Sequence, residues 1–129
     1  MKPKLVLLLT RETTFQALLV EALFGSGAIV LVAHTVTDAL RLVCARGPEL
    51  DLAVIDFDDG CHGMTLLSAI QTCQPDLAVI VATSNDVYHA AAVAYANGAA
   101  ACLAKPISAA ELKIVIEELA ETKLLLEAA

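Results

Sequence analysis

The segment Asp51-Leu52-Ala53-Val54-Ile55-Asp56 decides the fold of this chain. Its four central residues are apolar and two of them are β-branched, which is typical of a short strand buried on both faces. Four further apolar runs of similar length occur on either side of it: Leu5–Leu9, Ala28–Ala33, Leu77–Ala82 and Ala99–Ala104. Short strands buried on both faces favour a parallel sheet, and such a sheet needs helices between its strands.

The segments that follow the five runs have the periodicity of helices. Apolar residues recur at helical spacing over residues 15–23, 36–44 and 112–120, and more weakly over 66–73, while residues 87–97 are rich in alanine. Glycine or proline follows four of these segments, which are residues 15–23, 36–44, 66–73 and 87–97. Before the last segment, residues 112–120, Ser108 with Glu111 forms a capping-box pattern. The sequence therefore predicts five strands alternating with five helices, an α/β fold of the (βα)5 type.

Length and charge limit what the chain can do. Its 129 residues fit a single domain over 1–129, and 58% of them are hydrophobic, as a folded core requires. Eight Lys and Arg against 15 Asp and Glu give a net charge of −7, which disfavours direct binding to nucleic acid. The apolar run Leu5–Leu9 is too short for a membrane span, and the residues before it do not resemble a signal peptide. We expect a cytoplasmic protein without membrane contacts.

Polar residues that could carry chemistry follow four of the five predicted strands. In open parallel sheets the functional crevice lies at the carboxyl ends of the strands. These positions hold Thr10-Arg11-Glu12, Asp56–Gly60, Thr83-Ser84 and Lys105-Pro106. A carboxylate beside a hydroxyl and an ammonium group suits a phosphoryl acceptor, because phosphoryl transfer chiefly requires positioning and charge compensation.

The residues at these strand ends resemble the receiver domains of bacterial two-component response regulators. The resemblance covers essentially the whole chain and rests on four segments in order: Asp51–Asp56, Val79–Thr83, Asn97-Gly98-Ala99 and Leu103–Pro106. It implies a flavodoxin-like, doubly wound parallel sheet with strand order 2-1-3-4-5, and a signalling domain that is not an enzyme. It also implies three roles and a backbone feature: Asp56 as phosphoacceptor, Thr83 as switch hydroxyl, Lys105 as the ion-pair partner of Asp56 or the phosphoryl group, and a Lys105-Pro106 bond that is often cis.

The chain departs from the receiver pattern at the position of the metal-binding acidic pair. Thr10 and Arg11 stand there instead, and Glu12 follows one residue later. Counting Arg11 and Lys105 against Asp56 predicts a pocket whose charge is compensated without metal. We therefore expect Arg11 to pair with Asp56.

A Mg²⁺ cofactor is doubtful on the same grounds. Mg²⁺ needs oxygen ligands in an octahedral shell, usually with one or two carboxylates. Asp56, Glu12 and Asp58 are weak candidates for this role, provided that Glu12 or Asp58 turns into the pocket. A further departure lies at Cys102, where the family often has an aromatic residue.

Three functions remain open at this stage. In the first, a sensor histidine kinase phosphorylates Asp56, and Thr83 and Lys105 relay the change. In the second, the chain is a pseudo-receiver that contacts other signalling proteins independently of phosphorylation. A remote third alternative is a flavodoxin-type FMN protein, although the chain has no Trp and only two Tyr to stack on a flavin.

Apolar residues in the fourth and fifth predicted helices suggest self-association. Val87, Tyr88, Val93, Tyr95 and the run Leu124–Leu126 offer more apolar surface than a small monomer usually exposes. A homodimer through these two helices is the partner arrangement that we expect besides a signalling protein.

Overall fold

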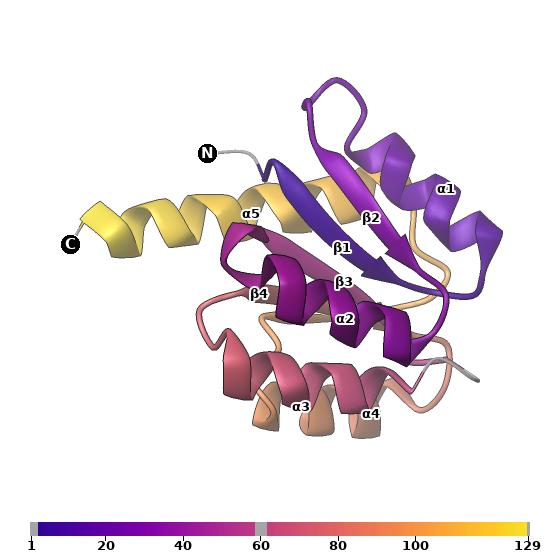
Figure 1. Ribbon diagram of the computed structural model, residues 1–129. Helices are drawn as coiled ribbons and strands as arrows, with labels where there is room; N and C mark the ends of the chain where they lie inside the picture. The colour runs from indigo at the N-terminus through magenta and orange to yellow at the C-terminus, as the bar shows by residue number, and fades with distance from the viewer. Residues whose placement is uncertain (1–2, 59–61, 129) are drawn as a thin grey trace.

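A five-stranded parallel sheet forms the centre of the protein (Figure 1). The computed structural model describes residues 3–58 and 62–128. The strand order is β2-β1-β3-β4-β5, which confirms the flavodoxin-like topology expected from the sequence. The strands are β1 (Leu5–Leu9), β2 (Ile29–Ala33), β3 (Leu52–Asp56), β4 (Ala78–Thr83) and β5 (Ala101–Ala104).

Helices cover both faces of the sheet. The first and last helices pack on one face and the three middle helices on the other, so each strand in the centre is buried on both sides. The helices are α1 (Thr13–Ala22), α2 (Val36–Arg46), α3 (Gly63–Cys73), α4 (Val87–Ala96) and α5 (Ala109–Ala128), with a short 3-10 turn at Gly47–Glu49. None of the helices in residues 3–58 and 62–128 is both long and apolar enough to cross a membrane.

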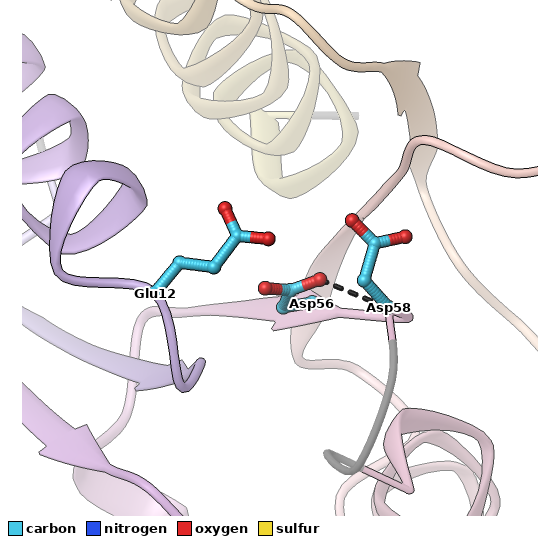
Figure 2. A group of neighbouring side chains, drawn as sticks. All are labelled: Glu12, Asp56 and Asp58. Carbon is cyan, nitrogen blue, oxygen red and sulfur yellow. Dashed lines mark hydrogen bonds between the residues drawn. The ribbon is translucent and has the colours of Figure 1, made fainter.

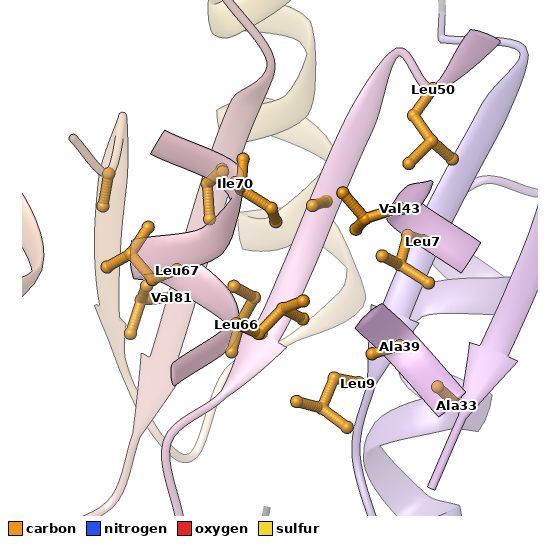
Figure 3. Packing of buried hydrophobic residues seen from close by; sticks show 14 of the residues in the cluster. Leu7, Leu9, Ala33, Ala39, Val43, Leu50, Leu66, Leu67, Ile70 and Val81 are labelled. Atoms are coloured by element: carbon orange, nitrogen blue, oxygen red, sulfur yellow. The ribbon is translucent and has the colours of Figure 1, made fainter. Parts of the chain in front are cut away.

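Alternate residues of β1 serve the two halves of the core. Leu7 and Leu9 pack with α2 and α3 (Figure 3), whereas Val6 and Leu8 pack with α1 and α5. All four side chains are fully buried. Because burial of each such side chain contributes about 1.5–3 kcal/mol, the unbroken apolar run explains why β1 lies near the centre of the sheet.

Several strand boundaries differ from those expected by one or two residues, and two of these differences concern the site. Asp56 and Thr83 are the last residues of β3 and β4 rather than the first residues beyond them, and they pair with residues of the neighbouring strand. Their backbones are therefore held by the sheet.

The last strand is shorter than expected because the turn before it is longer. Gly98 adopts a positive φ of 92°, and the Ala99 amide still donates to the Ala94 carbonyl at the end of α4. Ala99 and Ala100 consequently belong to the turn, and β5 begins at Ala101.

The connection between β5 and α5 has the features expected from the sequence. The Lys105-Pro106 peptide bond is cis. The Ser108 hydroxyl accepts a hydrogen bond from the Glu111 amide at 3.0 Å, which is one of the two hydrogen bonds of a capping box.

Candidate functional site

Asp56 lies at the carboxyl end of β3, in the centre of the sheet edge, and its side chain is only 1% exposed. One carboxylate oxygen, Oδ1, lies 3.0 Å from the Lys105 ammonium and accepts the Asp58 amide at 2.9 Å. The other oxygen, Oδ2, accepts the Thr10 hydroxyl at 2.7 Å. Both oxygens of a nearly inaccessible carboxylate are therefore engaged, as a buried charge requires.

Thr10 anchors the loop between β1 and α1. Its hydroxyl donates to Asp56 and accepts the Glu12 amide at 3.0 Å, while its own amide donates to Ala33 at the end of β2. The Thr10 carbonyl lies 3.0 Å from Nδ1 of His34. From the sequence, the only role expected of Thr10 was the replacement of an acidic metal ligand. Its position after a buried strand was the signal that it would face Asp56.

The Lys105 side chain, 11% exposed, lies among three carboxylates. Its ammonium is 2.8 Å from Asp58, 3.0 Å from Asp56 and 3.1 Å from Glu12. It also lies 4.8 Å from the centre of the Phe15 ring, a cation-π distance. Burial by itself lowers the pKa of Lys105, but its carboxylate partners outweigh burial and raise that pKa well above its ordinary value. The amine is thus held in its charged form.

Asp58 approaches the site from the loop after β3. Its Oδ2 contacts Lys105, and its Oδ1 accepts the backbone N–H of Ser84 at 2.9 Å. Burial raises the pKa of Asp58, but the bonds from Lys105 and Ser84 outweigh it, so the pKa lies below its ordinary value. Asp58 is therefore an ionised part of the site.

Thr83 ends β4 on the other side of Asp58 and is 2% exposed. Its hydroxyl lies 3.1 Å from the Asn85 carbonyl and 3.4 Å from Asp58 Oδ1, and it accepts the Asn85 amide at 3.1 Å. The predicted switch hydroxyl therefore faces Asp58 in this conformation. Every buried side-chain polar atom in the described part of the chain has a hydrogen-bond partner.

Glu12, Asp56 and Asp58 form a cluster that could hold a metal ion (Figure 2). One oxygen from each carboxylate lies within 4.8 Å of the other two. Carboxylate oxygens are among the ligands that Mg²⁺ prefers in proteins. With Lys105 included, the four side chains carry a formal net charge of −2. The prediction of a pocket with compensated charge is wrong. The charges counted for that prediction omitted Glu12 and Asp58 and included Arg11.

The expected pairing of Arg11 with Asp56 is also wrong. The Arg11 side chain is exposed, and within residues 3–58 and 62–128 it makes no ion pair. The positive partner of Asp56 is Lys105. The physical reason lies in the loop: Thr10 occupies the inward position beside Asp56, so the next residue points outward and Glu12 returns toward Lys105.

Comparison with known proteins identifies the family. Residues 6–117 match the family model of the response regulator receiver domain. The chain belongs to this family. It is a receiver domain of the response regulators that act in two-component signalling, and receivers are generally signalling domains rather than classical enzymes.

Solved structures of receiver domains are similar over most of the chain. A response regulator receiver domain protein from Clostridium thermocellum is 29% identical, with a TM-score of 0.83, over 95% of this chain and 98% of that one. The receiver domain of NtrX from Brucella abortus is 26% identical, with a TM-score of 0.80, over 91% and 98% of the two chains. In a longer NtrX structure the match covers 99% of this chain but 29% of that chain, at 25% identity and a TM-score of 0.86. No curated protein sequence matches the chain.

Proposed function

We propose that the chain, taken as a single receiver domain over 1–129, accepts a phosphoryl group on Asp56 from a sensor histidine kinase. Lys105 compensates the charge of Asp56 and of the phosphoryl group, and Thr83 serves as the hydroxyl that responds to it. The domain has no enzymatic turnover of its own in this role, acts in the cytoplasm, and requires no contact with nucleic acid or membrane. The family match gives no support to the FMN alternative.

One observation carries this proposal. The Asp56 carboxylate ends a central strand within 3.0 Å of the Lys105 ammonium, and two further carboxylates lie beside it. An acyl phosphate on Asp56 adds negative charge, so the reaction needs cations close to the acceptor oxygen. Lys105 supplies one fixed cation. The net charge of −2 that remains would favour a second, divalent cation.

Mg²⁺ fits this second position, with modest affinity. Glu12 and Asp56 would hold it together with water, since Mg²⁺ commonly uses one or two carboxylates. Both oxygens of Asp56 and both oxygens of Asp58 already have partners in the chain, so a bound ion would have to displace some of these contacts. When bound, the ion would neutralise charge on the transferred phosphoryl oxygens. Lys105 must share the same three carboxylates, which weakens metal binding.

The experiment is labelling by a small phosphodonor. The protein is incubated with acetyl phosphate and Mg²⁺, and covalent phosphorylation is followed by intact-protein mass spectrometry. We expect a phosphorylated species in wild type and none in Asp56→Asn, which keeps the shape of the side chain. Labelling that persists in Asp56→Asn, or that is absent from wild type at high donor and metal concentrations, contradicts the acceptor role.

The pseudo-receiver remains a second candidate because Asp56 is so well covered. Its side chain is 1% exposed, and both oxygens have partners in the chain. A domain with this arrangement can present a fixed surface to a signalling partner without phosphorylation. Failure of labelling together with retained binding to a partner protein favours this candidate.

A homodimer through α4 and α5 is compatible with either candidate. Tyr88 on α4 is 91% exposed, and Ile114 and Leu125 on α5 are 55% and 67% exposed. Together with Tyr95 on α4, 52% exposed, these make four large exposed apolar side chains on two helices, which favours a protein contact. The remaining residues proposed for this contact include Leu124 and Leu126, whose side chains lie outside the described part of the structure.

A further inference from the structure

The Asp58 carboxylate accepts contacts from three donors of different kinds. The Lys105 ammonium lies 2.8 Å from Oδ2, and the Ser84 backbone N–H donates to Oδ1 at 2.9 Å. The Thr83 hydroxyl lies 3.4 Å from the same Oδ1. These donors come from the ends of β4 and β5, whereas Asp58 itself follows β3, so two separate parts of the chain converge on an anion from a third.

Such a donor set is suited to binding an oxyanion. An ammonium group, a backbone N–H and a hydroxyl aimed at one point stabilise the charge on phosphoryl oxygens. Two of the three donors belong to Thr83 and Lys105, the residues that we propose contact a phosphoryl group on Asp56. The Lys105 ammonium lies 3.0 Å from Asp56 Oδ1 and 2.8 Å from Asp58 Oδ2, so the Asp58 carboxylate lies close to the acceptor.

We propose that Asp58 is a built-in occupant of the phosphoryl-oxygen pocket, and that its carboxylate must leave Thr83, Ser84 and Lys105 before Asp56 is phosphorylated. This inference rests on the proposed acceptor role of Asp56. Asp58 thereby acts as an autoinhibitory residue: it satisfies the donors in the resting state and opposes the incoming phosphoryl group by charge. In this conformation the Asp58 carboxylate is held by the donors of the oxyanion pocket.

The chemistry of labelling makes the competition explicit. A new P–O bond forms to a carboxylate oxygen of Asp56, while the P–O bond to the acetyl group of the donor breaks and acetate leaves with the electron pair. The phosphoryl oxygens then need the cation and the N–H that Asp58 holds. Two anions compete for these donors, because like charges about 4 Å apart repel each other strongly where water is largely excluded. Removal of the Asp58 charge should therefore favour an added phosphate.

Phosphate binding without covalent transfer is the deciding test. Inorganic phosphate is titrated into Asp56→Asn and into Asp56→Asn/Asp58→Ala, and the Ser84 amide is followed by NMR. We expect phosphate to bind at least about tenfold more tightly to the double variant, because a competing anion has been removed. Equal affinity in the two proteins overturns the proposal. Asp56→Asn/Asp58→Asn repeats the test with an isosteric side chain, which covers the case in which the alanine variant does not fold.

Labelling by acetyl phosphate separates this proposal from the acceptor role. Asp58→Asn should be labelled at Asp56 about tenfold faster than wild type at the same Mg²⁺ concentration. If neither protein is labelled but phosphate binding rises as expected, the acceptor role fails and the occupancy of the pocket by Asp58 stands. Slower labelling of Asp58→Asn overturns the autoinhibitory role, because Asp58 then contributes as a metal ligand.

Discussion

The Thr10 hydroxyl donates a 2.7 Å hydrogen bond to Oδ2 of Asp56, and both side chains are buried. The same hydroxyl accepts the Glu12 amide, so one side chain fixes both the acidic residue on β3 and the loop that carries Glu12. Where receivers typically place an acidic residue, this chain has a neutral donor. The consequence is a site in which both side-chain oxygens of Asp56 have partners within the chain itself.

Removal of the Thr10 hydroxyl should destabilise the fold. Thr10→Val keeps the shape but leaves Asp56 Oδ2 without its donor, and an unsatisfied buried acceptor costs about 1–3 kcal/mol. The free energy of unfolding, measured in urea at neutral pH, should fall by that amount. Thr10→Ser retains the hydroxyl and is the matched control. Equal loss in Thr10→Ser would mean that packing of the methyl group, and not the hydrogen bond, is responsible.

Arg11→Ala should leave both stability and metal binding nearly unchanged. The side chain is exposed and forms no ion pair within the described ranges, and such surface changes usually alter the free energy of unfolding by less than about 0.5 kcal/mol. Urea unfolding and Mg²⁺ titration check this. A decrease of more than about 1.4 kcal/mol in the free energy of unfolding would instead indicate that Arg11 compensates the charge of Asp56.

The Asp58 contacts should make stability depend on pH in the acid range. Because the folded state lowers the pKa of Asp58, the stabilisation is complete above the ordinary carboxyl pKa of about 4 and is lost as the pH falls through the lower folded value. Wild type should therefore exceed Asp58→Asn in free energy of unfolding by about 1–2 kcal/mol near neutral pH, and the difference should shrink toward pH 2. Urea unfolding of both proteins at several pH values measures it. A difference that is constant with pH would contradict the assignment.

Self-association should depend on α4 and α5. Sedimentation velocity over a range of concentrations is expected to show a dimer that Tyr88→Lys weakens, since the substitution places a charge in an apolar contact. Phe24→Lys is the control, because Phe24 is 88% exposed but follows α1. A monomer at all concentrations, or equal weakening by both variants, argues against this interface.

The sequence predicted a parallel sheet with Asp56, Thr83 and Lys105 at one edge, because apolar runs and the residues that end them are local features, whereas the strand order was implied by the resemblance to receiver domains. It did not predict the directions of the side chains in the loop after β1. Thr10 and Arg11 are adjacent, and only the bond from Thr10 to Asp56 decides which of the two points inward. The same limit applies to Asp58, whose partners Ser84 and Lys105 lie far along the chain.

Thr10→Asp should increase the affinity for Mg²⁺. The new carboxylate would stand beside Asp56 and Glu12, where the pocket already carries a net charge of −2 with Lys105 included. Without metal the substitution should destabilise the fold, because it replaces a hydrogen-bond donor with a like charge in a buried position. With metal the added oxygen ligand should raise the affinity by about tenfold or more and recover the lost stability, since a ligand that binds only the folded state stabilises it.

The control for this last variant is Thr13→Asp, which adds the same charge at an exposed position in the first turn of α1. Calorimetric titration with Mg²⁺ and thermal unfolding with and without the ion compare the two variants with wild type. Tighter binding in Thr10→Asp alone would show that the site at the end of β3 lacks only one carboxylate to bind Mg²⁺ well. An equal increase of Mg²⁺ affinity in both variants would mean that the ion responds to overall charge. No increase in Thr10→Asp would mean that Lys105 continues to bind the carboxylates and excludes the ion.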